Sequence, residues 1–187
     1  SSSISVQECC SSYENEQCDS LFDGIISGNN KWCSVAEPKF VEFRTTNAVQ
    51  VNGYTLYTAN DNASNPGRNP MNWVLKANLD GSNNWTIIDA VTNDATMQDV
   101  NYTSFDFEMD VPGTYRYFRF EVSEVHSGSD MQLGELQLFY EGNTLPNGVI
   151  QGPTPDTYIV DHGTVMTVKA IPDAGYALLE WSDDHRD

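Results

Sequence analysis

Short strand-forming runs recur along most of this chain, and no apolar stripe of helical period lasts long enough to compete with them. Within each run apolar and polar residues alternate, and the runs are separated by the turn-forming pairs Asn52-Gly53, Asp80-Gly81, Pro112-Gly113 and Ser127-Gly128. We therefore expect strands near Lys39–Thr45, Val51–Ala59, Asn72–Ala77, Trp85–Val91, Tyr102–Met109, Tyr115–Ser123 and Gln132–Tyr140. Strands of this length and spacing predict an all-β fold, an antiparallel β-sandwich.

Acidic side chains dominate the charge of the chain. Its 187 residues include 27 acidic and 9 basic side chains, which gives a formal net charge of −18. Such a charge repels phosphate backbones and anionic membrane surfaces, so we expect neither nucleic acid nor a membrane as a partner. A well-solvated secreted protein would account for the acidity, and so would an affinity for divalent cations, which take oxygen ligands.

No segment is a candidate for insertion into a membrane, because no apolar run approaches the roughly 20 residues of a membrane span. The chain starts at Ser1-Ser2-Ser3 and ends abruptly at Asp187. We interpret it as a mature or excised piece of a larger secreted or cell-surface protein.

All four cysteines, Cys9, Cys10, Cys18 and Cys33, lie in the first fifth of the chain. They form no paired C-x-x-C zinc pattern, so we interpret them as disulfide partners in an oxidising compartment. Because adjacent cysteines rarely bridge each other, Cys9 and Cys10 are each expected to pair with Cys18 or Cys33. The connectivity stays open, and free thiols are the alternative.

The last strand-forming run, Met131–Tyr140, contains one carboxylate, Glu135, where a hydrophobic strand gains nothing from a charge. An unpaired carboxylate in a low-dielectric site is costly, so Glu135 needs a partner. Asp23 lies far upstream in Leu21-Phe-Asp-Gly24, and a shared calcium ion would explain both acids. In the alternative, Asp23 caps a turn and Glu135 pairs with an arginine.

A boundary follows Tyr140, where Glu141-Gly-Asn-Thr-Leu-Pro-Asn-Gly148 is typical of a linker. We divide the chain into a sandwich at 1–141 and a linker with a partial β module at 142–187. Strands of that module are expected at Thr157–Val160, Thr164–Ile171 and Ala177–Trp181. About forty residues make a poor core, so this piece should dock on the sandwich or begin a longer module.

From Leu21 to Tyr140 the order of motifs resembles a discoidin-type domain, the coagulation-factor C-type β-sandwich shared by many bacterial carbohydrate-binding modules. The motifs include Leu-Phe-Asp-Gly, Gly-Arg-Asn-Pro-Met-Asn-Trp-Val, Tyr-Arg-Tyr-Phe-Arg-Phe-Glu-Val and Met-Gln-Leu-Gly-Glu-Leu-Gln-Leu. The resemblance implies a discoidin-like jelly roll. Residues 147–184, with Tyr-Ile-Val-Asp-His-Gly-Thr-Val-Met-Thr-Val, look like the opening of a bacterial cell-surface repeat. That likeness implies a multidomain parent protein.

The resemblance also implies a structural calcium ion between the early Asp-Gly turn and the last strand. Its ligands would be the side chains of Asp23 and Glu135, the carbonyls of Ser20 and Gly134, and an oxygen of Asn30. This chain departs from the family pattern between Asp23 and Trp32, where the turn is longer and lacks a second acidic residue.

The sugar site of the family transfers less directly. Galactose-binding relatives place a histidine just ahead of the strand that begins near Phe40, whereas this chain has Lys39 there, so simple galactose specificity is not implied. Planar amides and charged groups suit the hydroxyls of a polyol. Our candidate ligand-binding residues are Asn65, Arg68, Asn69, His126, Asp130 and Lys39. As alternatives, Arg68 anchors its loop and His126 is an exposed loop histidine.

No pattern of an enzyme is visible: neither a nucleophile elbow, nor H-E-x-x-H, nor a phosphate-cradling glycine loop occurs. The leading hypothesis is a non-catalytic carbohydrate-binding module of a larger secreted or cell-surface bacterial protein, with a structural calcium site. Its partner would be a glycan or polysaccharide. The alternatives are a protein-binding adhesion domain and a structural spacer.

Overall fold

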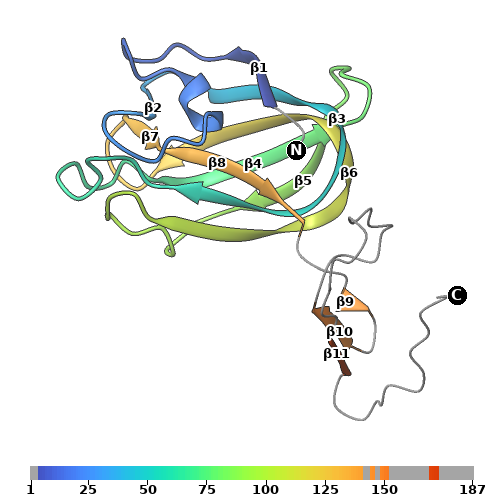
Figure 1. The fold of residues 1–187 in the computed structure, drawn as a ribbon. Coiled ribbons are helices and arrows are strands. Elements are labelled where there is room, and N and C mark those ends of the chain that lie inside the picture. The colour runs from blue at the N-terminus through green and yellow to red at the C-terminus, as the bar shows by residue number, and fades with distance from the viewer. Residues whose placement is uncertain (1–3, 141–143, 146–147, 152–168, 173–187) are drawn as a thin grey trace, which may run out of the picture. The chain divides into compact units, whose positions relative to one another are not determined.

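The computed structural model of the chain describes residues 4–140, 144–145, 148–151 and 169–172. The chain divides into two compact units, Ser1–Tyr140 and Glu141–Asp187. The first unit is the predicted all-β antiparallel sandwich (Figure 1), and its only helical element in the described range is the short 3₁₀ helix η1 at Cys18–Phe22. Its strands are β1 Ile4–Cys9, β2 Trp32–Ser34, β3 Lys39–Tyr57, β4 Pro70–Asn78, β5 Thr86–Val91, β6 Ser104–Val125, β7 Met131–Leu133 and β8 Glu135–Phe139.

Two long strands, β3 and β6, belong to both layers of the sandwich. The first part of β3 pairs with the last part of β6, from Lys39↔Val122 to Arg44↔Tyr117. The strands β1, β4 and β5 extend this layer in the order β1-β3-β6-β4-β5. The other halves of β3 and β6 pair from Gly53↔Glu108 to Tyr57↔Ser104, and β8 joins that part of β3. The register between β3 and β6 shifts between these halves, which is where the strands bend from one layer to the other.

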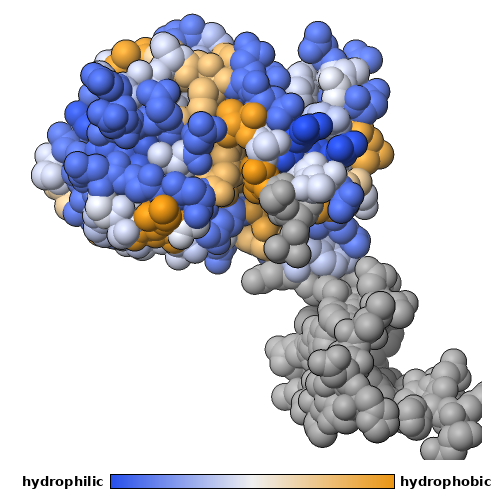
Figure 2. All heavy atoms as spheres, turned by 45° about the horizontal axis from the view of Figure 1, so that its top comes forward, coloured by the Kyte–Doolittle hydropathy of each residue, from blue (hydrophilic) through white to orange (hydrophobic). Residues whose placement is uncertain are grey.

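The core lies between the layers and is rich in aromatic side chains. Trp73, Phe118 and Phe120 are almost completely buried, as the alternating pattern of their strands requires. Trp73 Nε1 donates a 2.7 Å hydrogen bond to the hydroxyl of Tyr54, which in turn donates to Asp89. Burial raises the pKa of Asp89, although the Tyr54 hydrogen bond opposes this effect. Polar residues cover most of the face in Figure 2, which a strip of apolar residues interrupts.

Two glycine-containing pairs that were expected to end strands lie inside strands instead. Asn52-Gly53 and Pro112-Gly113 were expected to be turns, but both lie inside long strands, at or beside shifts in register. A Cβ at Gly53 would lie 2.3 Å from the ring of Phe139, so glycine here permits close packing and a bend. The strands β1 and β2 were not predicted, and the last predicted strand is split into β7 and β8 at Gly134.

Among the cysteines, Cys9 and Cys18 form a disulfide, while Cys10 and Cys33 are free. The bridge joins the end of β1 to the start of η1 across a sequence separation of nine residues. Cys33 is buried, and burial raises the pKa of its thiol to about 12. Of the two disulfides that the sequence allowed, the structure therefore contains one.

The second unit contains three short strands in the order β11-β10-β9, at Thr144–Leu145 (β9), Gly148–Gln151 (β10) and Lys169–Pro172 (β11). The strand β9 and the first residue of β10 lie in the segment that we expected to be a linker. The strand expected at Thr164–Ile171 overlaps β11, and those expected at Thr157–Val160 and Ala177–Trp181 lie outside the described residues. No helix in the described part of the chain has the length and apolarity needed to span a membrane.

Candidate functional site

An open pocket of about 420 Å³ lies where the loop between β3 and β4 meets the loop between β6 and β7. The two loops are joined by backbone hydrogen bonds from Ser127 N to Gly67 O at 2.8 Å and from His126 N to Asn69 O at 3.1 Å. The pocket is lined by Ser64, Asn65, Pro66, Arg68, Ser127, Gly128, Ser129 and Asp130. Its walls are therefore small and polar, and they carry one positive and one negative side chain.

An ion pair between Arg68 and Asp130 forms the charged part of the pocket. Arg68 Nη2 lies 3.0 Å from Asp130 Oδ2, and these side chains are 26% and 27% exposed. Arg68 Nη1 also donates to Oε1 of the buried Gln132 at 3.3 Å. The pair is held in place on its inner side and accessible on its outer side, so its remaining donors and acceptors can reach the hydroxyls of a ligand.

A buried cation, Lys31, supports both walls of the pocket from behind. Its ammonium lies 2.7 Å from Asp61 Oδ1 and 3.5 Å from Glu16 Oε1, and it donates to Gln132 Oε1 at 3.4 Å. Asp61 Oδ2 accepts from the amide of Asn65, a pocket residue, at 3.1 Å. Lys31 thus connects indirectly to both wall residues, Asn65 and Arg68. The sequence gives no signal of this role, because lysines mostly lie at the surface.

The structure brings three of the six candidate ligand-binding residues together: Asn65, Arg68 and Asp130 line the pocket. Asn69 is only 1% exposed, and its amide donates to the carbonyl of Gln98 at 3.0 Å and accepts from Asn62 at 2.7 Å. Asn69 therefore stabilises the loop instead of lining the pocket.

The other two candidates also lie outside the pocket lining. Lys39, at the start of β3, is 2% exposed, and its ammonium pairs with the carboxylate of Glu37. A buried lysine committed to an ion pair is not available to a ligand at the loops. The side chain of His126 is exposed, which agrees with its interpretation as a loop histidine.

Tyr13, which was not among the candidates, is hydrogen-bonded to a residue of the pocket lining without being part of that lining. Its hydroxyl donates to Asp130 Oδ1 at 3.2 Å, and the residue is 44% exposed. It comes from the segment between Cys9 and Cys18, ahead of the motifs that carry the family resemblance. The only signal in the sequence is an aromatic residue in a short polar segment between two cysteines.

The turn that carries Asp23 lies beside Glu135, 111 positions along the chain from Gly24. Gly24 N donates to Glu135 Oε1 at 3.2 Å, while Asp23 Oδ1 and Oδ2 accept from the amide of Asn30 at 2.9 and 3.0 Å. Glu135 is 3% exposed, and burial and the nearby Asp23 carboxylate raise its pKa to about 7. The backbone N–H of Gly24 opposes this increase.

One oxygen at this junction lacks a partner. Glu135 Oε2 is buried and accepts no hydrogen bond within the described residues. A buried carboxylate oxygen without a donor is costly, and a proton, a water molecule or a cation would satisfy it. No cluster of three or more His, Cys, Asp or Glu occurs in the described ranges, so any such cation would also need carbonyl or amide oxygens. Calcium accepts that mixture.

Comparisons with known proteins give the family. The model of the F5/8 type C domain matches residues 3–135, and that of the divergent InlB B-repeat domain matches residues 143–187. A peptide-N(4)-(N-acetyl-beta-glucosaminyl)asparagine amidase of Arabidopsis thaliana is 27% identical over 124 residues; these are 63% of this chain and 16% of that protein. The chain thus spans about a sixth of the length of that relative.

Two solved structures share the fold. The family 32 carbohydrate-binding module of EndoD from Streptococcus pneumoniae has a TM-score of 0.59 at 16% identity, with 74% of this chain and 96% of that chain covered. The family 32 module of NanJ from C. perfringens, in complex with galactose, has a TM-score of 0.56 at 15% identity, with 72% and 92% covered. Together with the motif order, the family match over most of its length shows that this chain belongs to the F5/8 type C domain family.

Proposed function

We propose that this chain is a non-catalytic carbohydrate-binding module of a larger secreted or cell-surface bacterial protein. The observation that carries the proposal is the loop-end pocket with an exposed Arg68–Asp130 pair on a rigid sandwich. The similar solved structures are described as carbohydrate-binding modules, one of them with bound galactose, which supports the same use of this fold. The match of residues 143–187 to a bacterial surface repeat supports a multidomain parent.

The chemistry of the pocket suits neighbouring hydroxyl groups. A guanidinium donates in a fixed planar geometry, and a carboxylate accepts, so Arg68 and Asp130 together match a diol that both accepts and donates. The amide oxygen of Asn65 and the serine hydroxyls of the rim would add further polar contacts, since the Asn65 amide nitrogen already donates to Asp61. Binding at one such shallow site is expected to be weak, because little apolar area is buried and hydroxyls also bond well to water. Several modules in one parent would provide avidity.

Glycan binding is tested by an array of neutral and acidic oligosaccharides, followed by calorimetry on the positive sugars. We expect saturable binding by the wild type and a loss of at least tenfold in affinity for Arg68→Ala. Lys76→Ala is the matched control, since Lys76 forms a comparable partly exposed ion pair with Glu121 on β4 and β6, outside the pocket. Binding to no glycan, or equal binding by both variants, contradicts the proposal. Capture of a protein partner would then favour an adhesion domain.

The same proposal includes a structural calcium ion at the junction of Asp23 and Glu135. The carboxylates of these two residues would hold it, with carbonyls of Ser20 and Gly134 and an oxygen of Asn30 completing the set. The ion would supply positive charge to the unpartnered Glu135 Oε2 and would tie the segment after η1 to the start of β8. Asn30 now donates to Asp23, so its side chain would need to present its amide oxygen instead.

Calcium binding is tested on the full chain by thermal unfolding with calcium and after chelation. An ion that binds only the folded state raises the melting temperature as the concentration of the ion increases. We expect this increase in the wild type and its loss in Glu135→Gln, which keeps the volume of the side chain. A melting temperature that does not respond to calcium in the wild type contradicts the metal site and leaves the glycan pocket untouched.

A further inference from the structure

We propose that Tyr13 is the aromatic contact of the pocket and that the Cys9–Cys18 disulfide holds it there, so that ligand binding is sensitive to reduction. The inference rests on the proposed function, because it names the ligand class of the same pocket. It assigns a binding role to the N-terminal segment 10–17, which lies ahead of the strands that form the pocket loops.

Tyr13 and Arg68 share one carboxylate. Asp130 Oδ1 accepts from the hydroxyl of Tyr13 at 3.2 Å, and Asp130 Oδ2 lies 3.0 Å from Arg68 Nη2. The phenol therefore ends at a pocket wall residue, while Tyr13 as a whole stays 44% exposed. A large aromatic side chain that is anchored at its polar tip and exposed along its body is a suitable contact for a ligand that is itself part polar and part apolar.

The pocket lacks an apolar surface without Tyr13. None of its eight lining residues is aromatic, and proline is the only one with a sizeable apolar side chain. A pyranose has an apolar C–H face as well as hydroxyls, and the polar walls satisfy only the hydroxyls. Tyr13 is the exposed ring that is bonded directly to the lining, so it completes the recognition of such a ring.

The charges of the pocket favour a neutral sugar. Arg68 is already paired with Asp130, so the lining carries no net charge that would attract a carboxylate or a sulfate. The net charge of −18 on the whole chain adds long-range repulsion toward anionic polysaccharides. The ligand class is therefore a neutral pyranoside with an exposed C–H face.

The backbone that carries Tyr13 is fixed at several points. Tyr13 N donates to the carbonyl of Cys33 in β2 at 3.0 Å, and the amide of Gln17 donates to the carbonyl of Tyr13 at 2.8 Å. At the ends of the segment, Cys9 belongs to β1, which pairs with β3, and Cys18 is a buried residue of η1. Breaking the bridge uncouples these two ends, and Tyr13 then loses part of its restraint.

The experiment measures the affinity of the full chain for methyl β-galactoside, N-acetylgalactosamine and N-acetylglucosamine by calorimetry. Tyr13→Ala should weaken binding about tenfold, whereas Tyr13→Phe, which keeps the ring, should weaken it about threefold at most. Cys9→Ser/Cys18→Ser should weaken binding severalfold, and a reducing agent should do the same to the wild type. In saturation-transfer NMR, C–H protons of the sugar should receive less transfer in Tyr13→Ala than in Tyr13→Phe.

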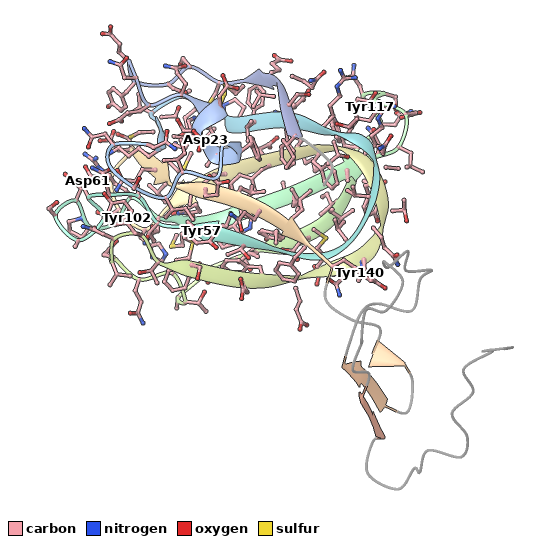
Figure 3. All side chains as sticks on the ribbon, viewed as in Figure 1. Asp23, Tyr57, Asp61, Tyr102, Tyr117 and Tyr140 are labelled. Carbon is pink, nitrogen blue, oxygen red and sulfur yellow. A yellow bond between two sulfur atoms is a disulfide. The ribbon has the colours of Figure 1, made fainter. Side chains whose placement is uncertain are left out.

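Tyr117→Ala is the control, because Tyr117 is a partly exposed tyrosine at the opposite end of the sandwich from Asp61 (Figure 3). It should bind as the wild type does. Loss of binding in Arg68→Ala together with full binding in Tyr13→Ala overturns the role of Tyr13 and leaves the glycan proposal standing. If the wild type binds none of the three sugars and no glycan on the array, both the role of Tyr13 and the glycan proposal are overturned. Equal weakening in Tyr13→Phe and Tyr13→Ala would show that the hydroxyl, not the ring, acts, and would overturn the aromatic contact.

Discussion

Replacing the buried cation behind the pocket should destabilise the whole sandwich far more than replacing a similar cation at the surface. We consider Lys31→Met, which removes the ammonium and keeps a flexible apolar stem. The Lys31 side chain is 4% exposed, and its ammonium is shared by Asp61, Glu16 and Gln132. The substitution leaves these groups without their cation.

The size of the stability loss depends on how far water can reach the polar groups that lose the Lys31 ammonium. Removing one partner of a fully buried ion pair costs about 3–5 kcal/mol, because the other charge stays buried and unpaired. The side chains of Asp61 and Glu16 are each 27% exposed, so water compensates part of their loss. Gln132 is fully buried, and its Oε1 still accepts from Arg68. We therefore expect Lys31→Met to lower the free energy of unfolding by about 2–3 kcal/mol.

Urea unfolding gives this quantity directly, provided that the slope with denaturant is the same in both proteins. Lys76→Met is the control, since Lys76 pairs with Glu121 at 3.3 Å while its side chain is 22% exposed. A partly exposed pair of this kind is worth about 0–1 kcal/mol. The double variant Lys31→Met/Asp61→Asn should cost less than the sum of the two single changes, because each removes the same contact. A loss for Lys31→Met no larger than that for Lys76→Met would refute the reasoning.

Three further outcomes are expected in stability measurements. Burial raises the pKa of Asp89, so the folded wild type loses stability as the pH rises from about 4 through that raised pKa. Asp89→Asn lacks this loss, so the difference in unfolding free energy between wild type and Asp89→Asn should shift in favour of the variant between pH 4 and pH 7. The same difference at both pH values would contradict the raised pKa. Gly134→Ala should cost about 1–3 kcal/mol in chemical unfolding, since its Cβ would lie 2.8 Å from the carbonyl oxygen of Thr58, and wild-type stability would exclude this clash. Cys9→Ser/Cys18→Ser should lose about 2–3 kcal/mol, the loop entropy of a bridge with a separation of nine residues, and no change under non-reducing conditions would contradict a bridge at this position.

Local pattern identified the strands of this fold better than their ends. The alternation in Lys39–Thr45 and Tyr115–Ser123 correctly marks halves of β3 and β6, because one face of each half is buried. The pattern does not show that each half continues through a bend into the other layer, since a glycine pair is equally suited to a turn and to a bulge. Which use applies depends on packing, as the ring of Phe139 over Gly53 shows.

The site was predictable only where a residue type was out of place. Glu135 in an apolar strand required a partner, and the backbone N–H of Gly24, next to Asp23, supplies one. Asn69 is a polar loop residue like Asn65, yet Asn69 is 1% exposed and bonded inside the protein, whereas Asn65 lines the pocket. Nothing in the sequence separates these two asparagines. Tyr13 escaped detection because its contact with Asp130 spans 117 positions and comes from a segment without a strand pattern.

The course of β8 has a mechanical consequence. This strand starts at Glu135, next to the Asp23 junction, and ends at Phe139, just before Tyr140, which lies at the opposite end of the sandwich from Asp61 (Figure 3). Beyond Tyr140 the polypeptide continues into the second unit. If the loops bind an immobilised glycan as proposed, a pull on the polypeptide beyond Tyr140 would put tension along β8. It then shears the antiparallel ladder from Tyr57↔Glu135 to Gly53↔Phe139. All rungs of such a ladder share a load applied along the strand, so this geometry favours mechanical resistance of the module.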